Sequence, residues 1–201
     1  MLRKIRTAST AALLVTMAFS ATAQGSGKTT TSKPRPAPKP PAAAPAPAPA
    51  APANTDSVSV NKFMWYAPGT QTVHVKLSAA LGSNNGGMNF NGNAGGAATI
   101  TVPLGWKVRM EFKNLDAIPH SAIIIANQQP LPTIPQTAAF GAAYTRDLTP
   151  GLFTDQTDDM NFKANPAGKY IMVCGVPGHG PSGMWIWFVV SADAKVPAYD
   201  M

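Results

Sequence analysis

The chain has 201 residues, and its 16 Lys and Arg outnumber its 9 Asp and Glu to give a formal net charge of +7. Seven of these cations precede residue 55, so residues 55–201 carry 9 cations and 9 acids and are formally neutral. A neutral domain has no basic stripe that would bind nucleic acid. A protein partner is therefore expected to dock through an apolar patch rather than through strong electrostatic steering.

Residues 1–23 have the three parts of a secretory signal peptide. A basic start is followed by an apolar stretch at 11–19 and by the small residues Ala-Thr-Ala at 21–23. The apolar stretch is much shorter than the roughly 20 residues that span a bilayer. Cleavage after Ala23 and export to the periplasm are therefore expected, and a membrane tether is possible only if the segment is retained.

Residues 24–54 have the composition of a disordered linker. Nine prolines lie between Pro34 and Pro52, and no apolar residue larger than Ala or Pro occurs in the segment. Such a chain cannot bury enough apolar surface to offset the entropy of ordering, and its Ala-Pro alternation favours extended polyproline II. The segment is predicted to be a solubilising spacer, with a docking arm for a partner or the cell envelope as the alternative.

Residues 55–201 are predicted to form a single all-β domain. Short runs of β-forming residues are separated by Gly, Asn and Pro clusters, which is typical of a β-sandwich. The segment 127–168 is expected to consist of loops with one or two strands or a short helical turn. Strands are predicted at 58–66, 73–77, 98–102, 106–113, 122–125, 169–174 and 184–191.

The strongest functional signal is the segment Cys-Gly-Val-Pro-Gly-His-Gly-Pro-Ser-Gly-Met. It begins at Cys174, the only cysteine, and places His179 five residues later and Met184 five residues beyond that. A thiolate, imidazoles and a weakly held thioether suit copper that cycles between two oxidation states. Alternation along the preceding strand points Cys174 inward, and a lone exported cysteine is better explained as a ligand than as a free thiol. The spacing therefore predicts a copper site.

Two further histidines are candidates for the remaining ligand. His74 lies in Thr-Val-His-Val-Lys-Leu, where alternation places it with Lys76 on the solvated face of a strand. His120 lies in Ile-Pro-His-Ser-Ala-Ile-Ile-Ile, at the start of an apolar run. His120 is therefore the predicted ligand, and His74 is its only rival.

With these motifs and the phrase Met-Asn-Phe-Asn-Gly at 88–92, the chain resembles the sulfocyanins, blue copper proteins of the cupredoxin family that are related to rusticyanin. The resemblance covers roughly 57–192 and is most specific in 171–187. It implies a cupredoxin-like Greek-key β-sandwich with one copper ion. His120, Cys174 and His179 would be its equatorial ligands, Met184 its axial ligand, and Ser121 a brace between ligand loops.

The resemblance also implies a periplasmic one-electron carrier that is not an enzyme. Its electron port would be the edge of His179, within an apolar patch that includes Val176, Pro177, Pro181 and Trp185. The expected partners are redox proteins of the cytochrome or terminal oxidase type, and a small neutral domain on a tether is expected to be a monomer.

Of three other functions, the sequence excludes one and leaves two as alternatives. A copper enzyme needs further histidine-rich sites, which a chain with 3 His cannot supply. A cysteine-dependent hydrolase would use Cys174 with His120. A copper trafficking or storage protein would use the same ligands to bind the cuprous ion, and it is the main alternative.

Overall fold

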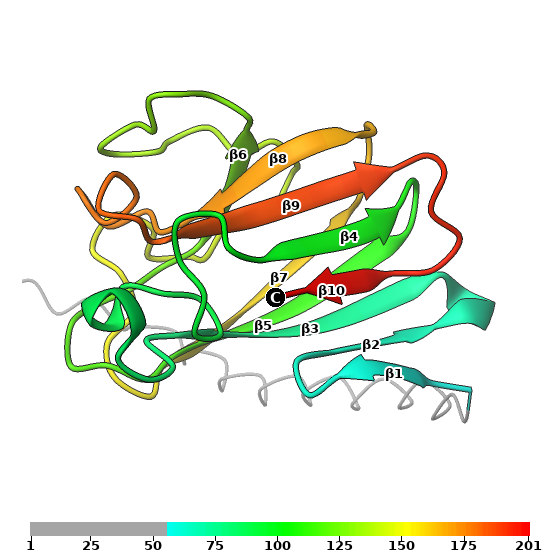
Figure 1. The fold of residues 1–201 in the computed structure, drawn as a ribbon, viewed down its shortest axis with the longest axis horizontal. Helices are drawn as coiled ribbons and strands as arrows, with labels where there is room; N and C mark the ends of the chain where they lie inside the picture. The colour runs from blue at the N-terminus through cyan, green and yellow to red at the C-terminus, as the bar shows by residue number, and fades with distance from the viewer. Residues whose placement is uncertain (1–55) are drawn as a thin grey trace, which may run out of the picture. The chain divides into compact units, whose positions relative to one another are not determined.

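The computed structural model describes residues 56–201, which fold into two β-sheets (Figure 1). The predicted signal peptide at 1–23 and the linker at 24–54 lie outside the described residues. No helix within residues 56–201 has the length and apolar character needed to cross a membrane. The elements are β1 (Val58–Asn61), β2 (Met64–Ala67), η1 (Pro68–Thr70), β3 (Thr72–Ala79), η2 (Asn84–Gly87), β4 (Thr99–Pro103), β5 (Lys107–Asn114), β6 (Ile123–Ala126), β7 (Thr157–Lys163), β8 (Gly168–Val173), β9 (Trp185–Ser191) and β10 (Ala198–Asp200).

The two sheets have five strands each and form the two layers of a sandwich. One sheet has the order β1-β2-β3-β5-β7, and the other has the order β10-β4-β9-β8-β6. The pairs β3/β5 and β4/β9 are parallel, and every other neighbouring pair is antiparallel. This arrangement confirms the predicted all-β sandwich.

The core lies between the sheets and is formed by every second residue of the central strands. In β5, Val108, Met110 and Phe112 are buried and alternate with charged residues that face outward. In β9, Ile186 and Phe188 are buried in the same cluster. This period of two is the pattern expected for strands with one buried face, and it fixes the register of each strand.

Strands β6 and β8 are apolar on both faces because a second, smaller cluster covers their outer side. Ile123, Ile125, Ile171 and Val173 form its centre. The residues packed against them come from the segment between β6 and β7 and from β9, and they are Leu131, Ala138, Leu148, Trp185 and Trp187. Strands β6 and β8, which adjoin the predicted copper ligands His120 and Cys174, are therefore held by packing on both faces.

The structure corrects two strand predictions. The predicted strand 58–66 is a hairpin of β1 and β2, in which the Phe63 N–H donates to the side chain of Asn61 at the turn (2.8 Å). The strand β10 was not predicted, because its three residues are too few to show a period. Within 127–168, β7 is the only complete regular element, in agreement with the expected loops and strand, and β8 begins at the last residue of this range.

Candidate metal centre

The register of three strands gathers the predicted ligands at one end of a sheet. Ile123 at the start of β6 pairs with Val173 at the end of β8, and Val173 pairs with Trp185 at the start of β9. Cys174 and Met184 adjoin these strand ends directly, and His120 precedes β6 by three residues. The loop 174–184, orange at the left of Figure 1, therefore returns to the strand end from which it starts.

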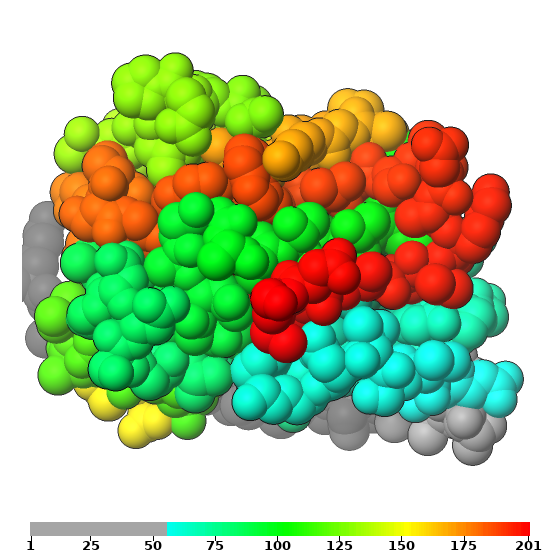
Figure 2. All heavy atoms as spheres, in the orientation of Figure 1, coloured from blue at the N-terminus to red at the C-terminus, as the bar shows by residue number. Residues whose placement is uncertain are grey.

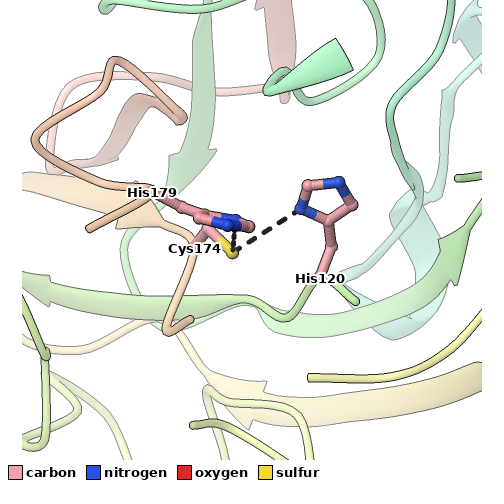
Figure 3. Close-up of side chains that lie close together, drawn as sticks. All are labelled: His120, Cys174 and His179. Atoms are coloured by element: carbon pink, nitrogen blue, oxygen red, sulfur yellow. Dashed lines mark hydrogen bonds between the residues drawn. The ribbon is translucent and has the colours of Figure 1, made fainter. Parts of the chain in front are cut away.

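His120, Cys174 and His179 come together in space (Figure 3). Their ligand atoms all lie within 4.8 Å of one another. The Cys174 Sγ is 3.6 Å from His179 Nδ1 and 4.0 Å from His120 Nδ1. The two imidazole rings are 5.0 Å apart and inclined by 58°. Two ring nitrogens and one sulfur thus converge on a common point.

Met184 is fully buried, and its backbone adjoins two of these residues. Its carbonyl accepts the N–H of Cys174 (3.1 Å), and its own N–H donates to the carbonyl of His179 (3.0 Å). These bonds close the loop around the cluster. A ligand role for the Met184 thioether remains a prediction.

The donor set fits copper. One thiolate with two imidazoles is the trigonal set of blue copper sites, and Cys174 has no disulfide partner. Within residues 56–201, this is the only group of three close His, Cys, Asp or Glu side chains. His74 is not part of it, because it points outward from β3 and stacks on Trp65 with a ring separation of 5.1 Å.

Burial sets the ionisation of the cluster. Burial lowers the pKa of His120 and also that of His179. The neighbouring His179 lowers the pKa of His120 further, whereas the charge of Asp116 opposes this change. Burial raises the pKa of the Cys174 thiol, although hydrogen bonds from the backbone and from Ser121 oppose this. Neutral imidazoles offer a free lone pair, but a thiol must lose its proton to bind a metal. Metal binding here is therefore coupled to deprotonation of Cys174.

His120 is held by contacts that its own sequence does not reveal. It exchanges two backbone hydrogen bonds with Leu152 (3.1 and 2.7 Å). The buried Asn114, at the end of β5, donates to the carbonyls of Asp116, Ile118 and Leu152. These bonds tie the His120 loop to β5 and to the segment before β7.

The outer nitrogen of the His120 ring faces a carboxylate. His120 Nε2 is buried without a hydrogen-bond partner, and Asp116 Oδ2 lies 3.7 Å from it. Histidines that bind metals commonly donate their second N–H to a carboxylate or carbonyl, which fixes the ring tautomer. Asp116 is thus placed to orient His120 when Nδ1 is used for a metal.

Ser121 connects three segments around the sulfur. Its hydroxyl donates to the Leu148 carbonyl (2.6 Å) and accepts the N–H of Gly175 (2.9 Å). Its backbone N–H donates to Cys174 Sγ (3.4 Å). This is the geometry expected of the predicted brace. The roles of Asn114 and Leu148 were missed, because a contact with a distant carbonyl leaves no local sequence signal.

Comparison with known proteins identifies a family. The model described as "Sulfocyanin (SoxE) domain" matches residues 59–200. A sulfocyanin from Sulfolobus acidocaldarius is 29% identical over 139 residues, which cover 66% of this chain and 70% of that protein.

Solved structures of copper proteins are also similar. Reduced rusticyanin aligns with a TM-score of 0.47 at 24% identity over 60% of this chain and 80% of that one. Auracyanin A, a "blue" copper protein from Chloroflexus aurantiacus, aligns with a TM-score of 0.45 at 22% identity over 60% of this chain and 99% of that one.

The family match extends over nearly the whole described domain, and within it a cysteine and two histidines form a cluster with the donor set of a blue copper site. The chain therefore belongs to the sulfocyanin family of blue copper proteins, which are electron carriers of the cupredoxin class, and its cofactor is copper.

Proposed function

We propose that this protein is a periplasmic one-electron carrier that holds a single copper ion with His120, Cys174, His179 and Met184. The observation that carries this proposal is the convergence of the Cys174 sulfur with two histidine nitrogens in a closed, largely buried site. Copper bound by such a set accepts and releases one electron at a time.

The protein contributes rigidity to this function. Cys174 and Met184 are joined by a backbone hydrogen bond, and His120 is paired with Leu152. Ser121 joins both ligand loops. Because these groups are held by hydrogen bonds within the protein, the site needs little rearrangement when its charge changes. A small rearrangement keeps the energetic cost of electron transfer low.

His179 is the proposed electron port. Its side chain is only half-buried, whereas His120 is fully buried. Pro177 and Pro181 beside it are exposed. The Gly178 N–H donates to the Thr133 carbonyl (2.9 Å), which brings the neighbouring Ile134, 42% exposed, close to this loop. An apolar surface around the edge of His179 supports short-lived docking of a redox partner.

Trp185 takes a different position from the one expected for the port. Its indole packs against Trp187, with ring centroids 5.0 Å apart, and adjoins Gly96. We therefore assign the port to Val176, Pro177, Pro181 and Ile134 around His179.

The wider cellular role is proposed from sequence. Residues 1–23 would direct export to the periplasm, and residues 24–54 would act as a spacer. The formally neutral domain would act as a monomer and exchange electrons with a cytochrome or terminal oxidase.

The test of this function is a redox titration of the copper-loaded protein, followed by incubation with a copper-free acceptor protein. An electron carrier is expected to show a reversible one-electron wave and to keep its copper during the incubation. A protein that hands over its copper and shows no reversible wave would instead be a trafficking protein.

The port is tested by electron self-exchange between two copies of the protein, which needs no knowledge of the natural partner. Pro181→Lys places two like charges face to face in the encounter, and we expect self-exchange to slow by about tenfold, or about 1.4 kcal/mol. The visible spectrum should not change, because Pro181 contributes no ligand. Line broadening in NMR spectra of mixed oxidised and reduced protein measures the rate.

Leu104→Lys is the matched control for the port. Leu104 is also an exposed apolar residue (43%). It directly follows Pro103, which pairs with Ser191 at the end of β9, whereas the ligand loop joins the start of β9 at the opposite end of the sheet. We expect its self-exchange rate to stay within about twofold of the unchanged protein, because a distant charge is screened by salt. Equal slowing by both variants would contradict the port assignment.

A further inference from the structure

A segment far from the ligand loop in sequence contacts it directly. Asn85 donates from its side-chain amide to the Ser182 carbonyl (3.0 Å), across 97 positions of the chain. The same amide also donates to the carbonyl of Met88 (2.8 Å). In Figure 2 this segment, green, lies against the orange ligand loop at the left. We call residues 85–96 the clasp segment.

The clasp segment also holds the backbone on both sides of Met184. The Gly95 N–H donates to the Gly183 carbonyl (2.8 Å), and the Gly96 N–H donates to the Trp185 carbonyl (3.1 Å). Gly183 and Trp185 are the two chain neighbours of Met184. The backbone path through Met184 is therefore fixed from outside the ligand loop.

The ring of Trp185 packs directly against the backbone of Gly96. A Cβ added at Gly96 would lie 2.4 Å from the six-membered ring of Trp185 and 3.0 Å from the indole nitrogen of Trp187. No side chain fits there without moving the indole, and Gly96 has a φ of +77°, which favours glycine. The position of the Trp185 indole, and with it the start of β9, thus depends on the absence of a side chain at residue 96.

The clasp segment is itself firmly anchored. The buried Asn91 accepts the N–H of Ser78 (2.8 Å) and donates to the Lys76 carbonyl (2.9 Å) and to the Tyr199 hydroxyl (3.1 Å). It is therefore tied to β3 and to β10. A segment bound to two sheets can hold a loop in place, whereas a free loop cannot.

We propose that the clasp segment positions Met184 for its axial role, with Asn85 and Gly96 as positioning residues. This inference rests on the proposed assignment of Met184 as a copper ligand. A methionine side chain has three rotatable bonds, and a long axial thioether contact is too weak to fix it. The loop 174–184 contains several glycines, and the hydrogen bonds of Met184 to Cys174 and His179 within it are supplemented by those from the clasp segment to Gly183 and Trp185.

Two adjacent glycines provide a matched pair of variants. Gly95→Ala and Gly96→Ala impose similar backbone strain, because φ is +61° at Gly95 and +77° at Gly96. Only the Cβ that Gly96→Ala introduces would meet the Trp185 indole, since nothing lies within 4 Å of the corresponding position at Gly95. We expect Gly96→Ala to change the ratio of the two thiolate-to-copper absorption bands in the same direction as Met184→Gln. Gly95→Ala should leave the ratio unchanged.

A double variant distinguishes positioning from general damage. If Gly96 acts through Met184, adding Gly96→Ala to Met184→Gln should change the band ratio no further, because coupled residues are not additive. An additive change in the double variant would overturn the proposal. So would equal band ratios in Gly95→Ala and Gly96→Ala.

Asn85→Gly extends the test to a milder change and to the copper-free protein. Asn85 has a φ of +51°, so glycine removes the side chain without straining the backbone. We expect hydrogen exchange of the copper-free segment 182–185 to speed up by about threefold or more. Asn61→Ala is the control, because its side chain accepts the Phe63 N–H at the turn between β1 and β2 and bonds to neither the clasp segment nor the ligand loop. Unchanged exchange in Asn85→Gly would remove this residue from the clasp.

The visible spectra of these proteins also distinguish a failure of this inference from a failure of the proposed function. A normal blue spectrum that responds to Met184→Gln but not to Gly96→Ala would overturn the clasp and leave the electron carrier intact. An unchanged protein that shows no intense visible band when loaded with cupric ion would instead overturn the ligand assignment itself.

Discussion

Replacing Cys174 with alanine is expected to abolish the intense visible absorption of the cupric protein and to weaken its copper binding by more than about 100-fold. Changes outside the ligand set alone can cost 10–100-fold in metal affinity, and Cys174 supplies the only thiolate. The fold should persist, because the removed sulfur leaves only a small cavity and costs about 1 kcal/mol of unfolding free energy. Visible absorption spectroscopy and calorimetric copper titration measure the two losses.

His74→Ala is the control for this prediction. His74 stacks on Trp65 on the outer face of β3 and takes no part in the cluster. Its removal should therefore leave the visible band intact, whereas His120→Ala should weaken the band severely. An intense band that survives in Cys174→Ala would contradict the ligand set, since no other thiolate in the chain can give rise to it.

The triad of His120, Cys174 and His179 that the structure brings together was predictable because its sequence signals are local. Cys174 and His179 share one short loop, and the apolar strand before Cys174 shows which way its side chain points. Strand alternation argued against His74, and the apolar run that follows His120 argued for His120; the structure places His74 on the outer face as expected. The same alternation predicted the strands that form the core, because one buried face gives a clear period of two.

The support around the triad was not predictable, because it depends on contacts between distant segments. Asn114 reaches the carbonyl of Leu152 across 38 positions, and Asn85 reaches that of Ser182 across 97. Asparagine is common in turns, so neither residue stands out in the sequence. Strand β10 was missed for a similar reason, because its three residues gain their order by pairing with β4.

Ser121→Ala is expected to destabilise the copper-free protein by about 2–4 kcal/mol. The hydroxyl of Ser121 satisfies the Leu148 carbonyl and the Gly175 N–H, and both groups lose this partner in the variant. Each buried polar group left without a partner costs about 1–3 kcal/mol. Chemical denaturation of the copper-free protein measures the loss, which we expect as a lower midpoint with an unchanged slope.

Ser191→Ala is the matched control for Ser121. The Ser191 hydroxyl also accepts backbone N–H groups, from Asp193 (3.2 Å) and Ala194 (3.0 Å). These groups are near the surface, so water can replace the hydroxyl and the loss should be about 0.5 kcal/mol or less. Equal destabilisation by the two variants would mean that Ser121 is an ordinary turn residue rather than a brace.

Ser121→Ala and Cys174→Ala should have opposite consequences. The backbone N–H of Ser121, which donates to the Cys174 sulfur, remains after the hydroxyl is removed. The visible band should therefore survive in Ser121→Ala although the fold is weakened, whereas Cys174→Ala should lose the band and only about 1 kcal/mol of unfolding free energy. Because copper binds only the folded state, loading with copper should also recover part of the stability lost in Ser121→Ala but little of any loss in Cys174→Ala.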